Sequence, residues 1–211
     1  MDIGLDTDEV DAERRERILT NISLTPLTEA PENGAFNSFD VRSDGAFILG
    51  CTFPTNCVAA FDKNGDFLYG YKFDTAGSFD VAFDGDGFAI YLVRSDVVAS
   101  FDKKGNALEL RMVKDTEKNN YYINNVFHAF KKEAGGCTYE KTNNMGVFNL
   151  LAFSFSRLVR TAADGNRTVI YDTSTFQNVR TAVIACAVIA FIAISAASFA
   201  RLVKSNARRN A

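Results

Sequence analysis

The chain has a single histidine, His128, so any Ser-His-Asp or Cys-His catalytic machinery would have to be built around it. Its segment, NNVFHAF, contains no nucleophile, which favours a histidine without a catalytic role. Two acidic turns, DKNGD at Asp62–Asp66 and DGDG at Asp84–Gly87, have the composition of calcium loops. An EF-hand loop ends in a carboxylate at its twelfth position, where these segments have Phe73 and Ser95. The sequence therefore predicts hairpin turns here, with no catalytic residue and no metal ion.

No glycine-rich phosphate-binding motif precedes a predicted helix, so no nucleotide cofactor is expected. Charge also restricts the partners. Residues 1–179 carry 18 bases and 26 acids, which gives this part of the chain a net charge of −8. A protein that binds nucleic acid needs clustered Lys and Arg to displace counterions from phosphates, so nucleic acid is excluded as a partner.

The four cysteines, Cys51, Cys57, Cys137 and Cys186, form no C-x-x-C pair, which argues against a zinc site. Cys51 and Cys57 flank the loop TFPTN and would face each other if two strands pair there. One interpretation is a disulfide bond between them, which would form in an oxidising compartment. The favoured interpretation is that both are small, half-buried free thiols, because free cysteine is among the most buried residue types.

The N-terminal 30 residues are predicted to form a short polar helix and a linker. Asp6, Thr7 and Asp8 precede EVDAERRERIL, and acids in the first turn followed by arginines suit the helix macrodipole. The segment has no basic region and no apolar stretch of the kind found in export signals. With few large apolar residues, the helix is expected either to dock weakly or to extend away from the domain.

The segment Thr181–Ala200 has twenty residues without charge, proline or glycine. About 20 residues of α-helix are needed to cross the hydrocarbon core of a bilayer. We therefore predict a single transmembrane helix over residues 177–203, followed by a basic tail over 204–211, and a lipid bilayer as one partner. The following residues are predicted to span the membrane: Ala182, Ile184, Val188, Phe191, Ile194 and Phe199.

The tail RLVKSNARRNA carries four bases and no acid, against Arg180 alone near the other end of the helix. The positive-inside rule then places the C-terminus in the cytoplasm and the domain outside. The lack of an export signal favours the opposite topology, that of a tail-anchored protein with a cytoplasmic domain. The extracytoplasmic domain is the favoured alternative.

A stretch of the chain is repeated after forty residues. FDKNGDFLYGYKF at Phe61–Phe73 aligns with FDKKGNALELRMV at Phe101–Val113, and the similarity extends back to FDV at Phe39 and Phe79. Alternating apolar residues and Gly, Asp or Asn turns predict four antiparallel strands in each unit. The predicted strands are 37–42, 46–52, 57–62 and 67–73 in the first unit and 79–83, 87–93, 97–102 and 107–113 in the second.

The turns of these units contain Asn64-Gly65 and Lys104-Gly105, which supply the positive φ of a hairpin. A third, distorted copy has Asp164-Gly165 in its turn, sixty residues after Gly105. The extra twenty residues predict a helical insertion near 119–134, broken by Gly135-Gly136. Four strands in forty residues are typical of a propeller blade. The expected fold is mainly β over residues 31–176, with about three antiparallel four-stranded meanders stacked as an incomplete or open propeller.

The stretches FDKNGDFLYGYKF, FDGDGFAIYLVRSDVVASFDKKGNAL and SRLVRTAADGNRTVIYDTS, followed by an apolar helix, resemble NHL-like or six-bladed-type β-propeller repeat proteins with a C-terminal membrane anchor. This family is found in Gram-positive anaerobes, and the resemblance covers about residues 36–200. It implies a fold and an arrangement but no activity.

Three functions follow from these expectations. The first is a membrane-anchored binding module with a protein partner or self-association and no catalytic site or cofactor. The second is a structural subunit that assembles through its transmembrane helix. The third, least favoured, is a propeller hydrolase of the lactonase type, which needs acidic side chains converging on a central metal.

Overall fold

The computed structural model of the 211-residue chain describes residues 4–146 and 154–209. The chain divides into two compact units, one up to Ser174, called here the β unit, and one from Thr175 onward. The first part of the β unit contains β1 (Thr7–Glu9), α1 (Ala12–Ile22), β2 (Thr25–Pro26), β3 (Ala35–Val41), β4 (Phe47–Phe53), β5 (Cys57–Phe61) and β6 (Phe67–Lys72). The middle part contains β7 (Phe79–Asp84), β8 (Gly87–Leu92), the 3-10 turn η1 (Val93–Ser95), β9 (Val97–Phe101) and β10 (Ala107–Val113). The last part contains α2 (Glu117–Tyr122), the π-helical η2 (Ile123–Phe127), β11 (Lys131–Ala134), β12 (Cys137–Thr142), β13 (Arg157–Thr161) and β14 (Arg167–Asp172).

The β unit consists mainly of three antiparallel sheets, as expected from the sequence. The first sheet has the strand order β2-β6-β5-β4-β3, the second β1-β10-β9-β8-β7, and the third β11-β12-β13-β14. Consecutive strands are neighbours in each sheet, so each contains a four-stranded meander. The eight strands predicted in the first two sheets are present, and their ends differ from the prediction by at most two residues.

The third sheet begins earlier than the sequence indicated. The predicted helical insertion over 119–134 is present as α2 and η2, but it ends at Phe127, and residues 131–134 form strand β11. Gly135 and Gly136, predicted to break a helix, instead form the tight turn between β11 and β12, with φ of 56° and 72°. Two successive residues with positive φ are what a two-residue hairpin requires, and Gly adopts this conformation without steric cost.

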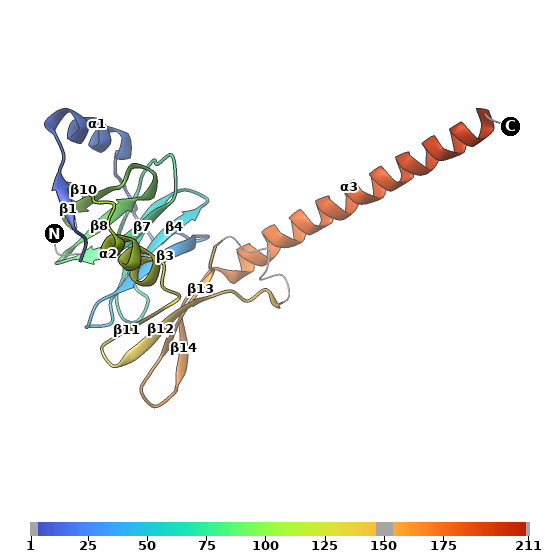
Figure 1. Ribbon diagram of the computed structural model, residues 1–211. Helices are drawn as coiled ribbons and strands as arrows, with labels where there is room; N and C mark the ends of the chain where they lie inside the picture. The colour runs from blue at the N-terminus through green and yellow to red at the C-terminus, as the bar shows by residue number, and fades with distance from the viewer. Residues whose placement is uncertain (1–3, 147–153, 210–211) are drawn as a thin grey trace. The chain divides into compact units, whose positions relative to one another are not determined.

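The N-terminal segment adds a fifth strand to each of the first two sheets, which the sequence did not indicate. Strand β1 pairs with β10, and β2 pairs with β6. Figure 1 shows β1, in blue, beside β10 of the green second sheet. Helix α1 is confirmed within the predicted N-terminal 30 residues, and Asp11 caps it by accepting a hydrogen bond from the Arg14 backbone N–H at 2.8 Å. The helix docks through Ile22, which is 2% exposed.

The first sheet packs between the other two. Its Ile48 and Val58 share an apolar cluster with Phe101 of the second sheet and with Ile22 of α1. On its opposite face, Phe61 and other side chains share a second cluster with the third sheet. As expected from the sequence, Phe61 and Phe101 are both buried between sheets. The far face of the second sheet is covered by side chains of α2 and η2, namely Tyr122, Ile123 and Phe127.

The turns that recur in the sequence share one geometry. In Asp62–Asp66 the carboxylate Oδ1 of Asp62 accepts hydrogen bonds from the backbone N–H groups of Asn64 and Asp66, at 2.8 and 2.9 Å. Asp102 makes the equivalent bonds forty residues later, at 2.8 and 2.9 Å. The positive φ is carried by the glycine of each turn, at 94° for Gly65, 81° for Gly105 and 83° for Gly165, and not by the residue before it. The acidic residues therefore have a structural role, stabilising the turn.

A pair of glycine substitutions tests the packing of the first sheet on the third. A Cβ at Gly65 would lie 2.6 Å from the backbone carbonyl oxygen of Ile170 in β14, whereas nothing lies within 4 Å of a Cβ at Gly165. Gly165→Ala should cost about 1–2 kcal/mol, the usual penalty of a left-handed conformation. Gly65→Ala should cost clearly more, because the two sheets must also separate. Thermal unfolding of the full chain in detergent compares the two variants, and equal losses would contradict this contact.

Helix α3 (Ser174–Arg209) follows the β unit. Within the described residues, one helix is long and apolar enough to cross a membrane, and the candidate span is Ser174–Phe199, of 26 residues. The helix begins earlier than the predicted start at residue 177 and continues past the predicted end at 203. Five of the residues predicted to span the membrane, Ile184, Val188, Phe191, Ile194 and Phe199, are 52–71% exposed, and Ala182 is also exposed.

Candidate functional site

The edge strands of the first two sheets, β3 and β7, are joined by side chains. The Val81 and Phe83 backbone N–H groups belong to β7, whose only strand neighbour in the described chain is β8. Ser38 Oγ accepts a hydrogen bond from the Val81 N–H at 3.2 Å, and Asp40 Oδ2 accepts one from the Phe83 N–H at 3.0 Å. Unpaired backbone donors on an edge strand are costly when buried and attract other strands when exposed. Ser38 and Asp40 of the first sheet therefore accept hydrogen bonds from two backbone N–H groups on the edge strand of the second sheet.

Asp40 also binds the third sheet. Lys132, on β11, places its Nζ 3.0 Å from Asp40 Oδ1, and its side chain is only 12% exposed. One carboxylate thus contacts both neighbouring sheets. Together with Asp80, His128 and Lys141, these two residues form what we call the interior ionic cluster.

Lys141 is the most buried cation of this cluster, with the residue 5% exposed. Its Nζ donates to the backbone carbonyl oxygens of Asn37 at 2.7 Å and of His128 at 3.4 Å. Asn37 lies at a register shift of β3, between Phe36 and Ser38. The ammonium group lies 5.1 Å from the ring centroids of both Phe130 and Phe155. Burial lowers the pKa of Lys141 to about 8, because its charged form has lost most of its hydration.

Asp80 and His128 form a second pair in the cluster. Asp80 Oδ2 lies 3.0 Å from His128 Nε2; the Asp80 side chain is 5% exposed and that of His128 is 46% exposed. Burial raises the pKa of Asp80, while attraction to His128, Lys141 and Lys132 opposes the rise. The contact between His128, at the end of η2, and Asp80, on β7, therefore links these two elements.

Sequence reasoning did not identify four members of the cluster, namely Asp40, Asp80, Lys132 and Lys141. A signal was present for the two acids, because the tetrapeptide SFDV occurs at 38–41 and again at 78–81. Asp40 and Asp80 are thus equivalent positions of the forty-residue pattern. Asp40 contacts the next sheet, whereas Asp80 contacts a helical segment. No pattern indicated the two lysines, since lysines on a strand are ordinarily solvent-exposed.

The other residues singled out in the sequence lie elsewhere. Cys51 and Cys57 are paired directly opposite each other on β4 and β5, as free and buried thiols. A hydrogen bond with the Cys57 thiol, together with burial, raises the pKa of Cys51 well above its usual value. The turn residues Asn64, Lys104 and Asp164 lie in exposed hairpin turns, away from the cluster. The cluster and these predicted residues are therefore separate features.

The interior ionic cluster joins the sheets through electrostatic contacts. Its two carboxylates, two amines and one imidazole link β3 and β7 to η2, β11 and β12, which come much later in the sequence. Within residues 4–146 and 154–209, no group of three or more His, Cys, Asp or Glu side chains is placed to hold a metal ion. This network links the first strands of the three sheets through charge-assisted contacts.

No protein-family model matches the chain, and no curated protein matches it either, so the function is inferred from the residues of this chain alone.

Proposed function

We propose that this chain is a single-pass membrane protein whose β unit is a propeller-type module that binds a partner protein. The observation that carries the proposal is the exposed apolar surface of α3 over Ser174–Phe199. Leaving an Ile, Val or Phe side chain in water costs about 1.5–3 kcal/mol relative to burying it. A bilayer is the environment that removes this cost along the whole helix.

The propeller assignment is supported by the meanders and by their packing. Each sheet contains four consecutive antiparallel strands, and the sheets share apolar clusters face to face. Their first strands, β3, β7 and β11, meet through the interior ionic cluster, as the inner strands of propeller blades meet around an axis. The far face of the second sheet is covered by α2 and η2, which supports an open array of three blades.

The binding role is supported by the rigidity of this scaffold and by the loops that it holds. Stacked sheets with a polar network fix the hairpin turns at their ends, and binding residues concentrate on loops held by rigid scaffolds. Leu68 and Leu108 occupy equivalent positions forty residues apart on β6 and β10, and they are 51% and 57% exposed. Photo-crosslinking from these two positions in membranes would identify a protein partner as a discrete adduct. A chain that gives no adduct from either position would contradict the binding role at these two positions.

We also propose that the β unit lies outside the cytoplasm, because Arg201, Lys204, Arg208 and Arg209 follow the span. Protease added to intact cells would then cleave the β unit and leave the C-terminal tail protected. Cleavage of the tail with protection of the β unit would overturn this orientation.

The membrane anchor is tested by placing charge at its centre. The double variant Val188→Arg/Ile189→Arg should lose membrane association, because each central Arg costs about 2.5–3.5 kcal/mol in insertion. The wild-type chain should remain in the membrane fraction after alkaline extraction, and the variant should not. Asn178→Arg, before the apolar run, is the matched control and should remain in the membrane. Equal extraction of the wild type and the double variant would contradict the anchor.

A further inference from the structure

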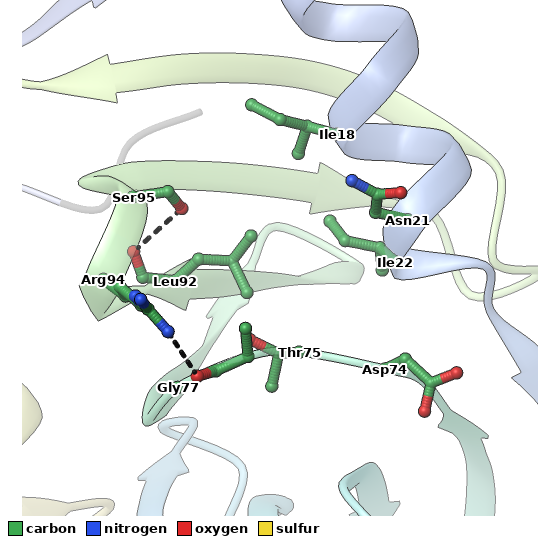
Figure 2. A pocket seen from close by; sticks show the side chains of 10 residues that line it. Ile18, Asn21, Ile22, Asp74, Thr75, Gly77, Leu92, Arg94 and Ser95 are labelled. Carbon is green, nitrogen blue, oxygen red and sulfur yellow. Dashed lines mark hydrogen bonds between the residues drawn. The ribbon is translucent and has the colours of Figure 1, made fainter.

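A surface cleft of about 520 Å³ lies between α1 and the second sheet. Its walls are the end of α1, the loop at residues 74–77 between β6 and β7, and the end of β8 with η1. Figure 2 shows the side chains of Ile18 and Ile22 opposite that of Leu92. This volume is in the range of small-molecule sites, about 300–1,000 Å³.

The floor of the cleft is part of the apolar core. Ile22 and Leu92 belong to the cluster shared by the first two sheets, and Ile18 packs against that cluster. Ile22 and Leu92 expose only 2% and 8% of their surface, between α1 and the 74–77 loop, and Ile18 is half-buried. An apolar ligand would therefore contact core side chains that are already fixed in position, which keeps the ordering cost of binding low.

Arg94 lies at the mouth of the cleft with unused hydrogen-bond donors. Its stem packs on Gly77, where a Cβ would lie 3.1 Å from the Arg94 Cβ. Its guanidinium makes one long hydrogen bond, 3.4 Å from Nη1 to the carbonyl oxygen of Ala76. Among the described residues no carboxylate lies within 4.0 Å of Arg94, unlike Arg42, Arg111 and Arg157. Figure 2 shows the Arg94 side chain directed toward the 74–77 loop, on the cleft side of β8.

The polar groups of the cleft are unevenly distributed. Arg14 lies outside the lining, where its Nη2 donates to the Ser95 carbonyl oxygen at 3.3 Å. Arg94 contributes the one cation of the lining, and Asp74 contributes the one carboxylate. The distribution favours one anionic group at the Arg94 corner and disfavours a second beside Asp74.

We propose that this cleft binds a small apolar monocarboxylic acid, whose apolar part contacts Ile18, Ile22 and Leu92 and whose carboxylate accepts hydrogen bonds from Arg94. The proposal goes beyond the protein-binding role inferred above, because it adds a small-molecule site to the β unit. A guanidinium and a carboxylate form charge-assisted hydrogen bonds in a planar, paired geometry. The apolar walls favour a ligand with an aryl or branched alkyl group over a hydrophilic acid.

The probe is 3-phenylpropanoate, titrated into the full chain in lipid nanodiscs and followed by calorimetry and ligand-observed NMR. The neutral analogue 3-phenylpropanol, with the same apolar part, measures binding without the charge. Arg94→Gln should weaken binding of the acid at least tenfold, since a hydrogen bond to a charged group contributes about 1.5–3 kcal/mol. It should leave the affinity of the alcohol unchanged. Lys104→Gln, which removes an exposed cation in a hairpin turn, is the matched control and should change neither.

A second variant tests the location of the site. Ala76 is exposed and lines the cleft, so Ala76→Trp should fill it and abolish binding of both probes without disturbing the core. Acid binding that is unchanged in Arg94→Gln, absence of saturable binding to the wild type, or binding only of a peptide with a free C-terminal carboxylate would overturn the proposal. A chain that fails these tests but resists alkaline extraction and forms the crosslinked adduct still satisfies the proposed function, so the two failures are distinguishable.

Discussion

Replacing Ile22 with aspartate is expected to unfold the β unit or to lower its stability by about 4 kcal/mol or more. Ile22 is the last residue of α1 and is 2% exposed in the cluster shared by the first two sheets. The substitution removes a buried side chain, which alone costs about 2–5 kcal/mol, and adds a carboxylate without a buried partner. The effect should extend beyond the site, because α1 connects β1 of the second sheet to β2 of the first.

Loss of α1 docking would leave β6 and β10 as open edges. Both strands gain their outer neighbour from the N-terminal segment, and open edges promote association between chains. The variant should therefore lose near-UV circular dichroism and self-associate in detergent. Thr20→Asp introduces the same carboxylate on the exposed side of α1 and should change stability by less than about 0.5 kcal/mol. Similar behaviour of the two variants would show that α1 is not part of the core.

The strands of the first two sheets could be predicted because their signals are local. Alternating apolar residues specify which side of a strand is buried, and Gly65 and Gly105 specify where the chain reverses. Strands β1 and β2 carry no such signal, since TDE and TP have neither apolar alternation nor β-branched runs. They form strands only because β10 and β6 present free edges to them. Tertiary context thus decides what short polar segments become.

Strand β11 was misassigned for a related reason. KKEA has three charged residues and an alanine, all good helix formers, so its sequence favours a helix. Pairing with β12 through the Gly135-Gly136 turn overrides that preference. The interior ionic cluster was beyond local reasoning, because Lys132 and Asp40 are 92 residues apart and Lys141 and Asn37 are 104 apart. Only the repeated SFDV tetrapeptide pointed toward it.

The stability of the β unit should rise with pH above neutrality because of Lys141. Its pKa is about 8 in the folded protein, against an ordinary lysine value of 10.5, so between these values the unfolded chain holds a proton that the folded chain has released. Stability increases with pH wherever the unfolded state binds more protons. This contribution is fully present above the unfolded pKa and is lost as the pH falls through about 8. Its full size is about 3 kcal/mol, from 1.36 kcal/mol per pKa unit.

Other groups have raised pKa values in the folded protein, so their effect on stability at high pH is opposite to that of Lys141. A hydrogen bond to Cys57 and burial raise the pKa of Cys51, and burial raises the pKa of Tyr69 to about 12. The folded state retains these protons longer than the unfolded state, so their contribution to stability declines as the pH rises past their ordinary values. The effect of Lys141 must therefore be measured as a difference between two chains that share these groups.

Lys141→Met provides that difference. Methionine keeps the aliphatic length between Phe130 and Phe155 but removes the buried charge, so the variant should be about as stable as the wild type or more stable at pH 7, despite losing the bonds to two carbonyl groups. From pH 7.5 to 10 the wild type should gain on the variant by about 2 kcal/mol in denaturant unfolding. Lys131→Met, whose side chain is 61% exposed on β11, should follow the wild type. Parallel pH profiles of wild type and Lys141→Met would mean that Lys141 remains hydrated and charged, and that the sheets are joined without a desolvated cation.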